Sequence, residues 1–229
     1  MSRSIPILLA LFLICLTGCA DTATQFNNST NQFFRFLGKT SDAATGKTAR
    51  KAAVRMEDTY FPDERREGIN DLVKRDFGKR EPYTKRYEQI AQFDNDWLVR
   101  ATAIRALNRA RHRESTPIFI KALNDPNEQV RLEACKALVH MPDDAAVTPL
   151  VRLVQSGEEN RDVRIAAAEA LQHYRSLEVA RALANTLAGR DFGVAYQAHQ
   201  TLTLITGRDL RYDEAAWLAY LTGPEKPFG

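Results

Sequence analysis

The chain has 229 residues, of which 44% are hydrophobic and 27% are charged, and its formal net charge is +3. These totals are ordinary for a globular protein, and so small a net charge gives no argument for nucleic-acid binding. The charge is nevertheless uneven, with 17 Lys/Arg against 11 Asp/Glu over 47–113 and 12 against 16 over 114–229. This sign change could orient a rod-like fold on an anionic surface, although solvated helix faces are the simpler explanation.

Residues 1–18 have the pattern of an export signal. Arg3 supplies a positive charge, and Ile5–Leu16 form an apolar run of 12 residues. The run is shorter than the about 20 residues that a membrane-spanning helix needs, but it suits the apolar region of a signal peptide. The first 18 residues are therefore expected to be removed from the mature protein.

The segment Leu16-Thr17-Gly18-Cys19 resembles the bacterial lipobox at every position. This resemblance implies cleavage after Gly18 and a lipid anchor on Cys19, with acyl chains such as palmitate. Several acyl chains together anchor a protein stably, whereas one chain is marginal. Ala20, in the place where Asp would retain a lipoprotein in the inner membrane, favours an outer membrane facing the periplasm if the envelope is Gram-negative. An ordinary signal peptide with an incidental cysteine is the alternative.

Residues 19–48 are rich in Thr, Asn, Ser and Gln and show no sustained period, which is typical of a flexible tether. The aromatic cluster Phe33–Leu37 within it either lies in the lipid interface or covers the first repeat. Residues 49–95 are expected to form divergent capping helices. Basic doublets stand beside Tyr83 and Tyr87. The simplest interpretation is that they lie on solvated helix faces, and the second is that they bind an anionic envelope surface. Export of the protein argues against nucleic-acid binding.

The chain then repeats one phrase. Copies begin at Val99, Val130 and Val163, and a weaker copy begins at Val194, with spacings of 31, 33 and 31 residues. A fixed period of this length indicates a solenoid of helical units. Residues 96–222 are expected to form these units and a C-terminal cap, and 223–229 a tail. The helices expected in the units span 97–111 with 115–124, 127–140 with 144–155, and 162–174 with 177–188.

The phrase resembles the HEAT repeat. A Val-Arg pair opens each full copy, an Ala-Leu pair closes it, and Pro117 and Pro149 stand near the start of the second helices. The resemblance implies an all-α fold, a right-handed α-solenoid of stacked antiparallel helix pairs preceded by the tether. An acidic residue stands six positions before each phrase arginine, and in HEAT-like proteins these positions tend to form a ladder between repeats. The expected ladder residues are Asp94 with Arg100, Asp125 with Arg131, and Glu158 with Arg164. Ala195 replaces the arginine in the fourth copy, so the stack is expected to end there, closed by Trp217 and Leu221.

We find no catalytic constellation, no metal site and no cofactor site in the sequence. Cys135 stands alone at a small apolar position of the phrase, which is typical of a buried hydrophobe rather than a reactive thiol. His140 and His173 occupy equivalent places in consecutive repeats, but no further ligand accompanies them at metal-binding spacing.

The resulting hypothesis is a membrane-anchored envelope lipoprotein that serves as a non-catalytic scaffold for an unknown protein or peptide. The binding surface would be lined by the second helices, with Lys121, Arg152 and Arg181 as exposed candidates. Two alternatives stay open. One is an enzyme related to HEAT-like lyases, and the other is a binder of an anionic envelope polymer through the basic N-terminal half.

Overall fold

The computed structural model describes residues 46–224 and 227–228. Across these residues the chain is helical, with eleven α-helices, four 3-10 turns and no strand. The predicted signal peptide, the lipidated Cys19 and the cluster Phe33–Leu37 lie outside the described residues. The α-helices are α2 (Gly46–Met56), α3 (Pro62–Val73), α4 (Tyr83–Phe93), α5 (Trp97–Ala110), α6 (Thr116–Ala122), α7 (Glu128–His140), α8 (Val147–Gln155), α9 (Arg161–Ala170), α10 (Leu177–Ala184), α11 (Phe192–Thr206) and α12 (Glu214–Thr222).

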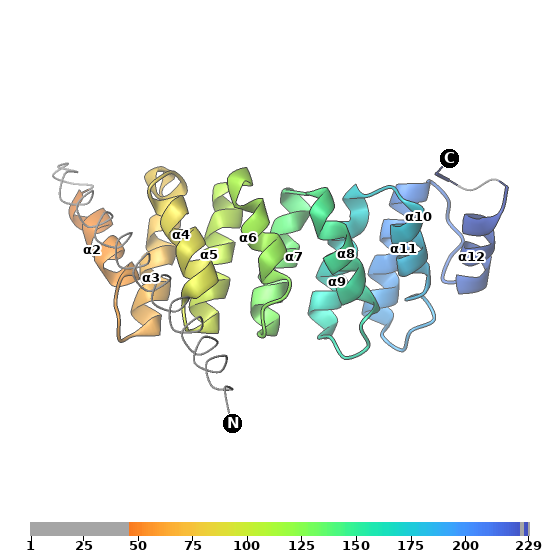
Figure 1. Cartoon of the computed structure of the whole chain (residues 1–229), viewed down its shortest axis with the longest axis horizontal. Helices are drawn as coiled ribbons and strands as arrows, with labels where there is room; N and C mark the ends of the chain where they lie inside the picture. Colours follow the sequence, from red (N-terminus) through yellow and green to blue (C-terminus); the bar gives the residue numbers. More distant parts are fainter. Residues whose placement is uncertain (1–45, 225–226, 229) are drawn as a thin grey trace, which may run out of the picture.

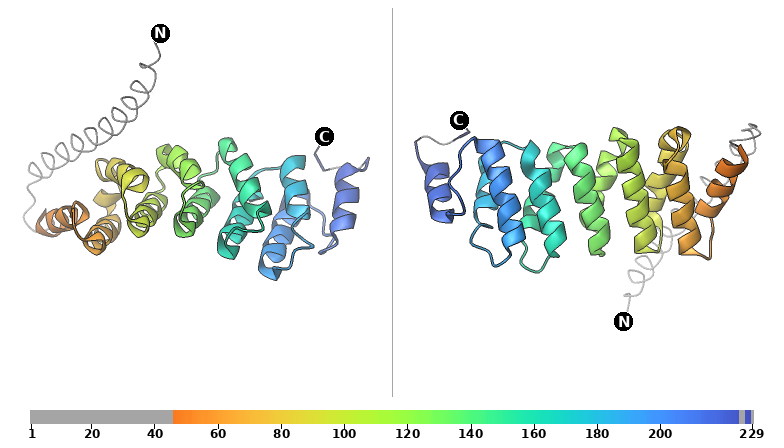
Figure 2. Two further views of the ribbon diagram at one scale, coloured as in Figure 1. Left: turned by 60° about the horizontal axis from the view of Figure 1, so that its bottom comes forward. Right: turned by 180° about the vertical axis from the view of Figure 1, so that it is seen from behind.

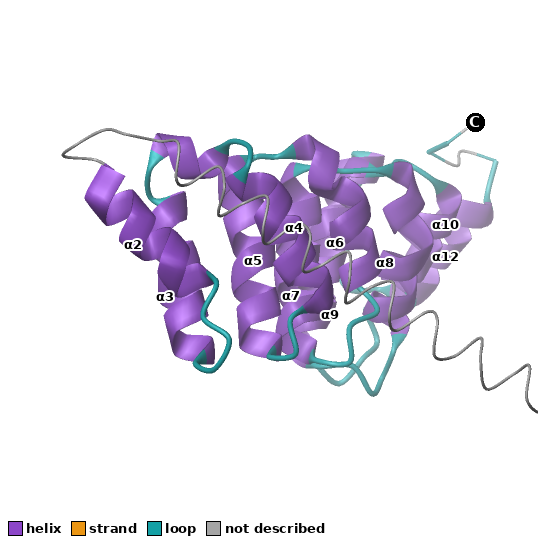
Figure 3. Cartoon of the chain, turned by 60° about the vertical axis from the view of Figure 1, so that its left-hand side comes forward, coloured by secondary structure: helices purple, strands orange, loops and turns teal. Residues whose placement is uncertain are grey.

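The helices form two layers of an elongated solenoid (Figure 1). The first-helix layer contains α3, α5, α7, α9 and α11, each packed against the next. The second-helix layer contains α4, α6, α8, α10 and α12, and α2 packs on α3 at the N-terminal end. The two turned views show the same row of antiparallel pairs (Figure 2), and the view from the N-terminal side shows helices joined by loops (Figure 3). The expected all-α solenoid is thereby confirmed.

Side-chain caps determine where α5, α7, α9 and α11 begin. Asp96 accepts hydrogen bonds from the amides of Leu98 and Val99, and Asn127, Asn160 and Asp191 cap α7, α9 and α11 in the same way. Each cap satisfies amides that a helix start leaves unpaired and contributes about 1 kcal/mol.

The repeated phrase forms the core of the solenoid. Its four opening valines and its four closing leucines are buried, as are the alanines between them. Small alanine side chains let the helices of neighbouring units approach closely, so one continuous core runs through the stack. Trp217 and Leu221 are fully buried at the C-terminal end, as the sequence led us to expect.

Several element boundaries differ from the expected ones. Helix α2 begins at Gly46, so the last three residues assigned to the tether are helical. The helix expected over 144–155 begins as a 3-10 turn at Asp144, and α9 ends at Ala170, where a 3-10 turn replaces its expected last turn. Helical periodicity does not distinguish a 3-10 turn from an α-helical one over three residues.

Candidate functional site

The seam between consecutive units is held by arginine–carboxylate pairs. In each pair the Nε and Nη2 atoms of the arginine donate to the two carboxylate oxygens, which is the bidentate geometry that guanidinium favours. All six side chains are mostly buried, with exposed fractions between 7% and 18%. The pairs are Arg65–Asp94 (2.8 and 2.9 Å), Arg100–Asp125 (2.8 and 2.9 Å) and Arg131–Glu159 (2.7 and 2.7 Å).

Each ladder arginine contacts two loops. Arg100 binds the carboxylate of Asp125 in the following loop, and its Nη1 donates to the backbone oxygen of Asp94 at 2.9 Å. The hydrogen bond that Arg100 donates to Asp125 raises the pKa of Arg100 above its ordinary value. Asp125 also accepts the amide of Asn127, the residue that caps α7. One aspartate therefore joins two units and organises the start of the next helix.

The pairing differs from the one expected from the sequence. For Arg100 and Arg131, the acid six residues before the arginine contributes its backbone oxygen, whereas the carboxylate comes from 25 and 28 residues further along the chain. The expected acid Glu158 is exposed, and Glu159 takes its place. Glu159 stands directly before the cap residue Asn160, whereas Asp94 and Asp125 stand two residues before theirs, and its extra methylene compensates for this shift.

The ladder weakens towards the C-terminus. Arg164 binds no carboxylate of the described residues, and its Nε donates to the backbone oxygen of Val154 at 3.2 Å. The next seam is held instead by Arg161 and Asp191 at 3.2 Å, with 62% of the arginine side chain exposed. At the other end, the sequence reasoning missed Arg65. Its signal is its position four residues after the cap, which Arg100 and Arg131 share.

The second-helix face carries the three cations proposed for partner binding. Lys121 on α6, Arg152 on α8 and Arg181 on α10 are exposed and follow one another at spacings of 31 and 29 residues. Lys121 Nζ lies 3.3 Å from Gln92 Oε1 on α4 and 5.6 Å from the centre of the Phe93 ring. Arg152 donates to the side-chain oxygen of Asn124. Among the described residues none of the three cations pairs with a carboxylate.

Two grooves open where the ladder meets the second helices. The larger has a volume of about 460 Å³ and lies between α6 and α8, lined by Asn124, Asp125, Arg131, Arg152, Ser156 and Glu159 among others. The smaller, of about 240 Å³, lies over the pairs Arg65–Asp94 and Arg86–Glu57. In both grooves the carboxylates of the ladder are already bound to arginine. The grooves therefore suit recognition better than acid–base chemistry.

Among the residues that the structure describes, no carboxyl group has a raised pKa. The shifted carboxyl pKa values in the described part of the chain belong to Asp58, lowered mainly by the amides of Phe61 and Tyr60, and Asp209, lowered mainly by a hydrogen bond from His199. A general acid needs the opposite shift. Burial raises the pKa of the Cys135 thiol, which favours the unreactive form.

The histidines that occupy equivalent repeat positions do not face one another. His140 Nδ1 lies 3.1 Å from Asn108 Oδ1, and His173 Nε2 lies 2.7 Å from the backbone oxygen of Val139. Each one contacts the unit that precedes it. Within residues 46–224 and 227–228, no group of His, Cys, Asp or Glu is arranged to hold a metal ion.

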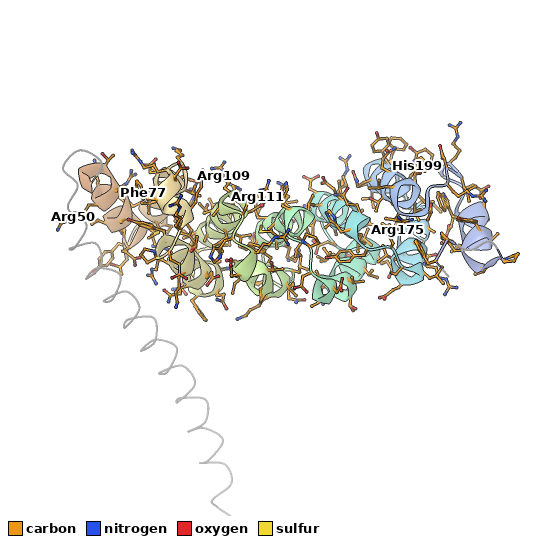
Figure 4. The ribbon with its side chains drawn as sticks, turned by 90° about the horizontal axis from the view of Figure 1, so that it is seen from above. Arg50, Phe77, Arg109, Arg111, Arg175 and His199 are labelled. Atoms are coloured by element: carbon orange, nitrogen blue, oxygen red, sulfur yellow. The ribbon has the colours of Figure 1, made fainter. Side chains whose placement is uncertain are left out.

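An aromatic cluster on α11 was not foreseen. Phe192 is 70% exposed, and its ring centre lies 5.8 Å from Tyr212 and 6.2 Å from Tyr196. Tyr212 also packs on His199 at 4.8 Å, and Figure 4 shows where His199 lies. The signal in the sequence is Phe192 at a position that Arg161 and Glu128 occupy in the preceding units.

The sequence of the chain is similar to one family of known proteins. A family model described as HEAT repeats matches residues 84–172 and, in a second alignment, 119–203. Together the matches span more than half of the chain. A comparison with curated proteins gives no match. Across the residues that the structure describes, no helix is long and apolar enough to cross a membrane.

Proposed function

The chain belongs to the HEAT-repeat family, and we propose that it is a non-catalytic scaffold that binds an extended acidic segment of a partner protein. We further propose that lipid on Cys19 holds this scaffold at a membrane. The row of Lys121, Arg152 and Arg181 on the second-helix face is the observation that supports the choice of partner.

The spacing of this row suits a particular kind of peptide. The first helices of consecutive units pack on one another, and packed helices lie about 8–10 Å apart, so the units that carry the three cations recur at roughly that interval along the solenoid. A polyproline II helix has 3 residues per turn and rises about 3.1 Å per residue, so every third side chain returns to the same edge after about 9 Å. An acidic residue at every third position would therefore meet one cation per unit.

The carboxylates that line the two grooves favour a scaffold over a lyase-type enzyme. Their carboxylates are bound to ladder arginines, and the shifted carboxyl pKa values fall rather than rise. Detection of a bound substrate in either groove, with a carboxyl of raised pKa beside it, would favour the enzyme.

Peptide binding tests the scaffold directly. The probe is a fluorescent peptide with Glu at every third position, and the control is a peptide of the same composition with its glutamates gathered at one end. We expect the spaced peptide to bind more tightly, and Lys121→Glu with Arg152→Glu and Arg181→Glu to abolish the difference. The matched control variant reverses Lys136, Arg175 and Arg190, which lie off this face. Equal affinity for both peptides, or equal loss in both variants, would contradict the proposed surface.

The anchor is tested separately. Expression in a bacterial host with labelled palmitate should label the chain, and mass spectrometry should find Cys19 as the modified N-terminus. Cys19→Ala should lose the label and the membrane fraction. Intact residues 1–18 in the mature protein would contradict the anchor, while leaving the peptide result unaffected. We expect the outer membrane, facing the periplasm, in a Gram-negative host.

A further inference from the structure

The loops along the two long edges of the solenoid carry opposite charge. The loops that join one unit to the next hold eight Asp/Glu and one basic residue, and we call this side the acidic edge. Its carboxylates have structural tasks, since they cap the first helices and form the ladder. The loops of the acidic edge are 57–61, 94–96, 123–127, 156–160 and 185–191.

The opposite edge, where the first helix of a unit turns into the second, is basic between α3 and α4 and between α5 and α6. The turns 74–82 and 111–115 hold six Lys/Arg against three Asp/Glu, and Arg109 adds a cation in the last turn of α5. The third turn, 141–146, has two aspartates and no basic residue. We call the first two turns with Arg109 the basic edge.

The arginines of the basic edge are free to bind a ligand. Arg75, Arg80, Arg109 and Arg113 are exposed, and no carboxylate in the described residues pairs with them. The guanidinium of Arg111 donates to the side-chain oxygen of Asn108, at 3.3 Å, and forms no ion pair with a described residue. Because the 3-10 turn at Asp76–Lys79 packs against α5, the two basic turns form one surface. Seen from this edge, Arg109 and Arg111 lie side by side (Figure 4).

The chain also enters the solenoid at this edge. Helix α2 and α3 are antiparallel and are joined at the acidic edge by the loop 57–61, so α2 begins on the opposite side (Figure 1). Its first turns expose Arg50 and Lys51. The described part of the chain therefore begins on the side on which the arginines lie.

We propose that the basic edge binds the headgroups of anionic phospholipids and that the solenoid stands on the membrane with its acidic edge away from it. The helix axes run from one edge to the other, so this orientation leaves the second-helix face open to a partner. Each Lys or Arg held near an anionic surface strengthens partitioning about fivefold. The proposal adds an orientation to the scaffold proposed above, but it needs no acyl chain.

Vesicle binding tests the proposal. The protein is the chain from residue 19 onward with Cys19→Ser, so that no lipid contributes. The probes are vesicles of equal parts phosphatidylglycerol and phosphatidylcholine, compared with phosphatidylcholine alone. We expect binding to the anionic vesicles only, with an affinity that falls steeply as salt is raised.

Two variants with the same net charge separate location from total charge. Replacement of Arg75, Arg80, Arg109 and Arg113 by Gln should weaken vesicle binding at least about a hundredfold. The matched control replaces Lys121, Arg152, Arg181 and Arg190, which are exposed on the second helices or at the acidic edge, by Gln and should change vesicle binding little. Circular dichroism should show that both variants fold. Equal weakening by the two variants, or no binding of the parent chain, would overturn the proposal.

Orientation is measured by fluorescence. A dye on Glu81→Cys, at the basic edge, should be quenched by quenchers attached to lipid headgroups, whereas a dye on Glu158→Cys, at the acidic edge, should not. Equal quenching of the two dyes would contradict the orientation. Binding to single-stranded RNA without binding to vesicles would assign the edge to nucleic acid and would also overturn the proposal.

Discussion

Arg100 and Asp125 form the central pair of the inter-unit ladder, with both carboxylate oxygens bound to one guanidinium at 2.8 and 2.9 Å. Asp125 in addition accepts the amide of Asn127. The same aspartate thus serves the seam and the start of α7, so its loss should affect both.

Asp125→Ala should lower the free energy of unfolding by about 2–4 kcal/mol, because it leaves a mostly buried guanidinium without its partner. Urea unfolding measures this change, and a double-mutant cycle with Arg100→Ala should show a coupling of at least about 1 kcal/mol. Glu158→Ala, which removes an exposed acid outside the ladder, is the control and should cost less than about 0.5 kcal/mol. Additive effects of the two ladder substitutions would contradict the pair.

Gly68 marks a close crossing of α2 and α3. A Cβ atom at this position would lie 2.4 Å from the backbone nitrogen of Met56 and 2.5 Å from the backbone oxygen of Ala52. We expect Gly68→Ala to destabilise the N-terminal end by about 1–3 kcal/mol and to increase hydrogen exchange in α2. Gly157→Ala, where a Cβ meets nothing within 4 Å, is the matched control. Unchanged exchange in α2 would contradict the close contact.

Lowering the pH should remove the contribution of the His199–Asp209 pair to the stability of the fold. The hydrogen bond from His199 holds the pKa of Asp209 below its usual range. A lowered folded-state pKa stabilises the fold above the unfolded value of about 3.9, and this stabilisation is lost as pH falls through the folded pKa. The Tm difference between the parent chain and Asp209→Asn should therefore shrink as pH falls from 5 to 2 in about unit steps. A difference that grows in acid would contradict the pair.

Cys135 should be unreactive in the folded protein. It is fully buried, and burial raises the pKa of its thiol. A thiol reagent should modify Cys135 in the Cys19→Ser chain only as fast as the protein opens, and rapidly in urea. Rapid modification without denaturant would show that the second unit is open in solution.

The sequence by itself determined the units, their helix pairs and their core. Each phrase places Val, Ala and Leu at helical spacing, and this local pattern decides which residues are buried wherever neighbouring units stack. The N-terminal caps follow in the same way, because a cap is a contact between residues two or three positions apart. Arg100 and Arg131 of the ladder could likewise be found from their place in the phrase, whereas Arg164 has the same place and pairs with no carboxylate among the described residues.

Only the tertiary structure decided which partners those arginines have. Asp125 is 25 residues from Arg100 along the chain, and its approach depends on how far one unit is displaced against the next. The carboxylate in the ladder belongs to Glu159 and not to Glu158. Glu159 stands one position later in its loop, and its side chain is one methylene longer than that of aspartate. The distribution of charge also depends on the tertiary structure. The formal net charge is +3, but the stacking of the helices places alternate loops on opposite sides of the solenoid, and this produces an acidic edge and a basic edge.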